Sequence, residues 1–69
     1  MERIKVKNID HSDWKDHKYM VIRDCRNETG SNYGFWYWGS YDNLSQAHQE
    51  AKELCNGVLV ETKDVNKYE

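Results

Sequence analysis

The sequence contains no proline, two cysteines and a single phenylalanine. Without proline, the chain lacks the residue that commonly stiffens loops and protects sheet edges, and slow prolyl isomerisation is absent from folding. Charged residues make up 32% of the chain and mean hydropathy is -1.08, so no apolar run approaches the length of a membrane span. The first residues, MERIKVKNID, alternate charged and apolar residues rather than forming the apolar segment of a signal peptide. We therefore expect a cytoplasmic protein with no membrane association.

In a reducing compartment, Cys25 and Cys55 are expected to be free thiols that are buried as small apolar residues. His11 and His17 share a polar loop with three aspartates, but their spacing matches no known metal-ligand pattern. His48 is expected at the border of a helix's apolar stripe. There is no glycine-rich phosphate loop, and 69 residues offer little volume for a ligand pocket. We therefore predict a protein that is not an enzyme, with no metal, cofactor or small-molecule substrate.

A length of 69 residues fits a single domain, 1–69, with a small core. Charge is unevenly distributed along it. Residues 1–26 carry seven Lys/Arg and five Asp/Glu, whereas residues 27–69 carry three and seven, so the two parts have net charges of +2 and -4. This predicts a dipolar surface, much weaker than the dense positive surface of a protein that binds duplex DNA.

The first half of the chain has three strand-like runs. Alternating lysine and apolar residues predict a strand over 3–9 with one face in water. Residues 10–18 are polar and predict a loop that folds Trp14 back onto the core. The run 19–25 has apolar residues at both odd and even positions, which predicts a central strand buried on two sides. A short turn then predicts that the strand over 33–40 is its antiparallel hairpin partner.

The second half predicts one helix, over 43–57. Asn43 suits its N-cap with Gln46 as capping-box partner, and Gly57 suits the left-handed position after the last turn. The helix has one apolar stripe, formed by Leu44, Ala47, His48, Ala51, Leu54 and Cys55. Alternation over 57–65 predicts an edge strand, and 66–69 predicts a frayed tail. The expected fold is α+β: a small, mostly antiparallel sheet (β-β-β-α-β) with one helix packed on one face.

Aromatic residues are concentrated in the segment NYGFWYWGSYDN, residues 32–43. Six of the nine aromatic residues lie there: Tyr33, Phe35, Trp36, Tyr37, Trp38 and Tyr41. On a strand they point to both faces, and one helix with a Leu/Ala stripe can cover one face. At about 25 cal/mol per Å², covering two tryptophans contributes about 8 to 12 kcal/mol, which is comparable to the whole stability of a small domain.

Three hypotheses account for the second face. Trp14 and the 10–18 loop cover it within the monomer, two copies associate through it, or it binds a partner protein. A variant of the third is single-stranded nucleic acid, whose bases would stack on sheet aromatics. The basic residues that would flank these aromatics are Arg3, Lys5, Lys7, Arg23 and Arg26.

The sequence favours protein over nucleic acid, because its basic residues are few and alternate with acidic ones. We therefore predict a small binding module acting by protein–protein contact: a homodimer, or an adaptor or inhibitor of the kind found in phages and mobile elements. The alternative is a single-stranded nucleic-acid-binding protein. The predicted contact residues are Trp36, Trp38, Met20, Ile22, Arg23 and Trp14. Exchanging the faces would move the anchors to Tyr33, Phe35 and Tyr37.

Overall fold

The computed structural model describes residues 3–10 and 12–68, which form one α-helix and one five-stranded sheet. The strands are β1 (Ile4–Lys7), β2 (Tyr19–Asp24), β3 (Phe35–Tyr41), β4 (Gly57–Glu61) and β5 (Val65–Lys67), and the helix is α1 (Leu44–Glu53). Three short 3₁₀ helices connect them: η1 (Trp14–Asp16), η2 (Gly30–Asn32) and η3 (Thr62–Asp64). The predicted α+β class is confirmed.

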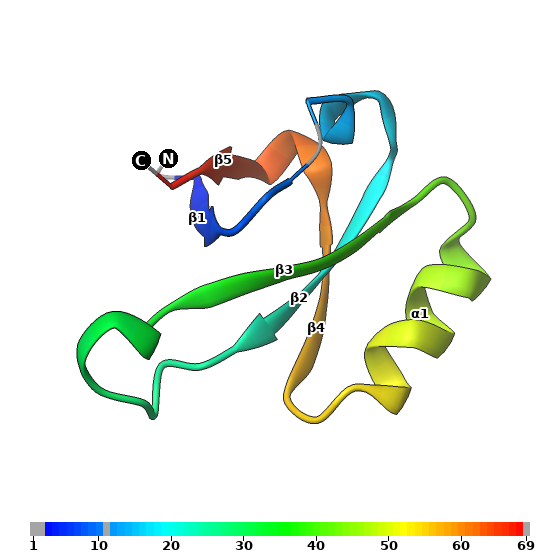
Figure 1. Cartoon of the computed structure of the whole chain (residues 1–69). Helices are drawn as coiled ribbons and strands as arrows, with labels where there is room; N and C mark the ends of the chain where they lie inside the picture. The colour runs from blue at the N-terminus through cyan, green and yellow to red at the C-terminus, as the bar shows by residue number, and fades with distance from the viewer. Residues whose placement is uncertain (1–2, 11, 69) are drawn as a thin grey trace.

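The sheet is mixed, whereas the sequence predicted a mostly antiparallel one. Its strand order is β4-β2-β3-β1-β5 (Figure 1). β2 is antiparallel to β3 and to β4, so the predicted hairpin and the predicted edge position of β4 are both confirmed. β1 is parallel to both β3 and β5. The difference therefore arises where β1 joins the free edge of β3 and β5 joins β1, long-range contacts that local patterns do not specify.

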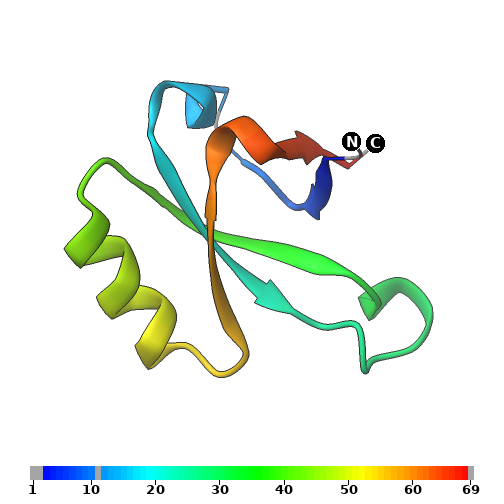
Figure 2. The same ribbon diagram turned by 180° about the vertical axis from the view of Figure 1, so that it is seen from behind.

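The predicted frayed tail, 66–69, is largely ordered by backbone pairing. Residues 66 and 67 belong to β5, which runs beside β1 (Figures 1 and 2). The N–H of Tyr68 also donates to the carbonyl of Val6 at 2.9 Å. This pairing exists because η3 interrupts the predicted 57–65 strand and redirects the chain so that β5 runs parallel to β1. Glu69 lies outside the described residues.

The helix begins as predicted but ends differently. The side chain of Asn43 accepts a hydrogen bond from the N–H of Gln46 at 3.0 Å, which confirms the N-cap. At the other end Asn56, rather than Gly57, takes the left-handed conformation, with φ of 61°. Gly57 instead begins β4, where a Cβ would collide with the carbonyl oxygen of Ala51. Glycine is therefore required for the close approach of β4 to α1.

Each face of β3 packs against other parts of the chain, although α1 leaves Trp38 exposed. One cluster of buried residues consists of Val6, Ile9, Trp14, Met20, Ile22 and Val65. Phe35 and Tyr37 of β3 pack against this cluster. Val21 points to the opposite face, where α1 packs and Ala47 is fully buried. The second apolar neighbour that β3 requires is therefore supplied by β1, η1 and β5, and the prediction that Trp14 folds onto the core is confirmed.

The thiols lie nearer the surface than predicted. Cys25 and Cys55 are free, but Cys25 is half-buried and Cys55 is exposed. Cys55 is exposed because α1 ends at Glu53, so the predicted stripe does not continue to it. Among the residues described, no helix combines the length and apolar character that a membrane crossing requires.

Replacing Trp14 by alanine tests the internal cover of the second face. Trp14 is 4% exposed, so we expect Trp14→Ala to lower the free energy of unfolding by about 3 to 5 kcal/mol, measured by urea denaturation. Leu44→Ala is the control, because Leu44 is 53% exposed on α1. Equal effects of the two substitutions would contradict this account of the core.

Candidate functional site

Three of the six predicted contact residues are core residues. Met20 and Ile22 are 0% exposed and Trp14 is 4% exposed, so they do not lie on a surface that a partner can reach. This corrects the site prediction. The physical reason is that β2 is paired on both edges, while β1, η1 and β5 cover the face on which Met20 and Ile22 lie.

The other three predicted contact residues lie together at the surface. Trp38 is 54% exposed, Trp36 is half-buried, and Arg23 is exposed. Arg23 and Trp36 are directly opposite each other in the β2–β3 register. The indole N–H of Trp36 donates to the carbonyl of Asn32 at 3.0 Å, which fixes the ring.

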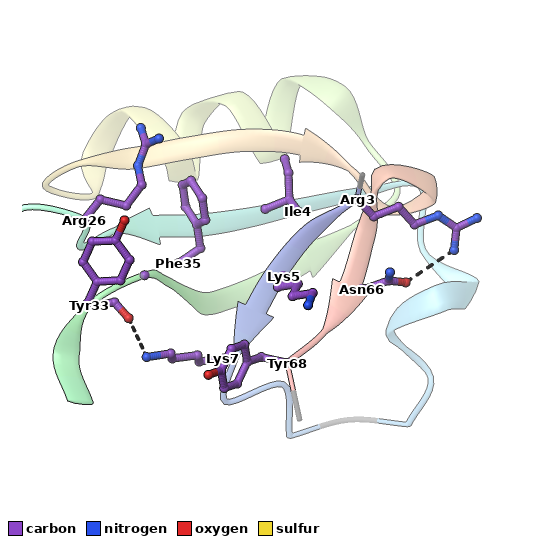
Figure 3. A pocket seen from close by; sticks show the side chains of 10 residues that line it. Arg3, Ile4, Lys5, Lys7, Arg26, Tyr33, Phe35, Asn66 and Tyr68 are labelled. Carbon is purple, nitrogen blue, oxygen red and sulfur yellow. Dashed lines mark hydrogen bonds between the residues drawn. The ribbon is translucent and has the colours of Figure 1, made fainter. Parts of the chain in front are cut away.

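A groove lies between β1 and the start of β3 (Figure 3). It has a volume of about 850 Å³ and is lined by Arg3, Ile4, Lys5, Lys7, Arg26, Tyr33, Gly34, Phe35, Asn66 and Tyr68. β1 pairs with β3 at two positions, Val6 with Phe35 and Lys7 with Trp36. Because this pairing does not extend back to Ile4, the first half of β1 leaves the segment before β3 uncovered. We call this hollow the basic groove.

The charge of the basic groove is positive. Arg3, Lys5 and Lys7 alternate along β1, so their Cα atoms are about 6.6 Å apart. Arg3 donates from Nη1 to the side-chain oxygen of Asn66 at 3.4 Å, a neutral partner, and no carboxylate of the described residues pairs with it. Among residues 3–10 and 12–68, no acidic side chain lines the groove.

Lys7 is held at the centre of the site. Its ammonium donates to the carbonyls of Tyr33 and, at 3.2 Å, Ser31. It also lies 5.2 Å from the ring centroid of Tyr68 and 5.6 Å from that of Trp36. These partners are neutral, so Lys7 keeps its full charge while its position is fixed.

Two exposed tyrosines flank this cation. Tyr33 is 54% exposed and Tyr68 is 51% exposed, and Figure 3 shows their side chains on either side of the Lys7 ammonium. Gly34, next to Tyr33, has φ of 123°, a conformation that favours glycine, and its backbone lies against the Lys7 side chain. Exposed phenol rings are surfaces on which a flat ligand can stack.

Arg26 is the fourth cation of the groove, but it is already paired. Its guanidinium lies 4.9 Å from the Phe35 ring centroid and donates to both carboxylate oxygens of Asp24, at 2.9 and 2.8 Å. These hydrogen bonds lower the pKa of Asp24 and raise that of Arg26. Asp24 is therefore ionised at neutral pH, and it offsets the charge that Arg26 brings to the groove.

The histidines form no comparable site. His17 lies 3.2 Å from Asp42, which links the 10–18 loop to the turn before α1. His48 is exposed, and His11 lies outside the described residues. Within the described part of the chain, no three His, Cys, Asp or Glu side chains come together as metal ligands would.

Comparisons with protein-family models, with curated proteins and with solved structures found no match. The sequence identifies Arg3, Lys5, Lys7, Arg23 and Arg26 as the basic residues of the nucleic-acid alternative. All of these except Arg23 line the basic groove. Asn66 and Tyr68 were missed, because their segment was predicted to fray. The alternation of Val65 with polar residues was the one available signal.

Proposed function

We propose that this protein is a non-enzymatic module that binds single-stranded nucleic acid in the basic groove. One observation carries the proposal: Arg3, Lys5 and Lys7, three cations with no carboxylate partner among the described residues, line the same groove as two exposed tyrosine rings. Proteins that bind single strands combine a positive groove for the backbone with aromatic rings for the bases.

The dimensions favour an extended strand as ligand. The Cα atoms of Arg3, Lys5 and Lys7 repeat at about 6.6 Å, which is of the order of the distance between successive phosphates in an extended single strand. A duplex keeps its bases stacked inside, where Tyr33 and Tyr68 would find no free base to contact. Three cations are also few for a duplex binder, whose affinity depends on many phosphate contacts.

The net charge of -2 is compatible with this function because charge is segregated. The carboxylates of α1, β4 and η3 do not line the groove. The same dipole would orient the protein as it approaches a polyanion. We also place the activity in the cytoplasm, which suits the free thiols of Cys25 and Cys55.

Protein contact, either with a partner or between two copies, is the second candidate. Its support is Trp38, which is 54% exposed beside Arg23. The burial of Trp14, Met20 and Ile22 leaves this surface smaller than the sequence predicted. The nucleic-acid proposal has broader support than protein contact, because the basic groove supplies both cations and exposed rings.

Binding of a labelled oligothymidylate, followed by fluorescence anisotropy, tests the proposal. Three phosphate contacts predict a log-log salt slope of about -2, so affinity should fall about 20-fold between 50 and 200 mM salt. A duplex of the same length should bind more weakly. Sedimentation velocity on the free protein is the control, and we expect a monomer. Absence of binding at low salt would contradict the proposal.

Two charge substitutions should move this affinity in opposite directions. Lys5→Gln removes a groove cation, so the salt slope should become shallower by about 0.7. Asp24→Asn frees Arg26 from its carboxylate, so affinity should rise several-fold and the slope should steepen by about the same amount. The two variants should be compared with the wild-type protein in the same anisotropy assay, after circular dichroism has shown that both are folded. Equal weakening by both would contradict the assignment of charge in the groove.

A further inference from the structure

A second hollow lies on the same side of the sheet as Lys7. It has a volume of about 310 Å³ and is lined by Arg23, Cys25, Glu28, Asn32, Trp36, Tyr37 and Trp38. We call it the tryptophan hollow. Glu28 is the one acidic residue in its described lining, and Arg23 carries the opposite charge. It is rich in aromatic surface, as a stacking site requires.

The two hollows meet at Lys7 and at the turn before β3. Lys7 lines the basic groove, and its ammonium lies 5.6 Å from the ring centroid of Trp36, which lines the tryptophan hollow. Lys7 and Trp36 are also register partners, so they emerge on the same face of the sheet. The consecutive residues Asn32 and Tyr33 line one hollow each.

Different local features determine the positions of the two tryptophan side chains. Trp36 is fixed by its hydrogen bond to Asn32 at 3.0 Å. Trp38 sits at a register shift: Val21 pairs with Gly39 and Ile22 with Tyr37, so Trp38 has no opposite residue in β2. Such a bulge redirects a side chain away from the regular alternation. It explains why Trp38 is 54% exposed although its strand is internal to the sheet.

Cations and rings alternate across neighbouring strands. Lys7 on β1, Trp36 on β3 and Arg23 on β2 follow one another in register. At about 4.8 Å per strand, this row spans about 10 Å, which is enough for a nucleotide that leaves the groove. α1 packs on this same face, at the end of the sheet remote from the turn between β2 and β3 (Figures 1 and 2). The turn therefore projects away from the helix.

We propose that a bound single strand leaves the basic groove over Lys7 and continues into the tryptophan hollow, where a base stacks on Trp38 and Arg23 contacts the backbone. This inference rests on the proposed function and extends it from one groove to a continuous path. It predicts that affinity depends on strand length. A strand of about three nucleotides fills the groove, and one of about five reaches both hollows, since the row beyond Lys7 adds about 10 Å.

The test compares these two oligothymidylates against three variants by fluorescence anisotropy. Wild-type protein should bind the longer strand at least about 5-fold more tightly, because stacking of one base contributes about 5- to 160-fold. Trp38→Ala should abolish this advantage and leave affinity for the short strand unchanged, whereas Trp38→Phe should retain most of it. Tyr33→Ala should weaken binding of both strands.

Two controls make the result specific. Leu44→Ala changes an exposed apolar residue on α1, 53% exposed, and should affect neither strand. Arg23→Gln should make the salt slope shallower by about 0.7 for the longer strand alone. A length advantage that survives Trp38→Ala would overturn the continuous path and return Trp38 to the protein-contact hypothesis. Failure of wild-type protein to bind either strand would instead overturn the proposed function itself.

Discussion

β1 joins the sheet through two residue pairs with β3, and both the core and the groove depend on this short parallel contact. Val6 opposite Phe35 brings an apolar residue into the buried cluster, while Lys7 opposite Trp36 brings a cation to the other face. Because the pairing stops there, the first half of β1 leaves β3 and opens the basic groove. The β1–β3 pairing thus places apolar side chains on one face of the sheet and a cation on the other. β5 pairs with the opposite edge of β1 and so fixes the position of β1.

The elements that depend on local signals could be predicted. The β2–β3 hairpin, the Asn43 cap and the burial of 20–22 on both faces all follow from turn residues, capping chemistry and apolar runs. Placing Met20 and Ile22 in a contact surface overlooked that same double burial. The predicted contact surface counted the helix alone as cover. The alternative hypothesis, cover by Trp14 and the 10–18 loop, is closer to the structure, in which β1 and β5 also contribute.

Long-range contacts could not be predicted from these patterns. The parallel pairs of β1 depend on how far η3 turns the chain, and a three-residue strand such as β5 gives almost no periodic signal. For the same reason the sequence did not predict Asn66 and Tyr68 as groove residues. The bulge at Trp38 could not be predicted either, because the alternation of apolar and polar residues carries no signal for one extra residue in a strand.

The charge arrangement explains how a chain with a net charge of -2 presents a positive site. Arg3, Lys5 and Lys7 have neutral partners or no described partner, whereas Arg26 is neutralised by Asp24. Net charge therefore gives the wrong impression of this surface. The relevant quantity is the number of cations that a ligand can reach without competing with a carboxylate.

The measurement that tests the central claim most directly is NMR mapping of amide chemical shifts during titration with a short single-stranded oligonucleotide. The account predicts that the largest changes fall in residues 3–8, 31–36 and 66–68, with α1 unaffected. Changes centred on α1 or β4, or none at all, would contradict the assignment of the basic groove as the binding site.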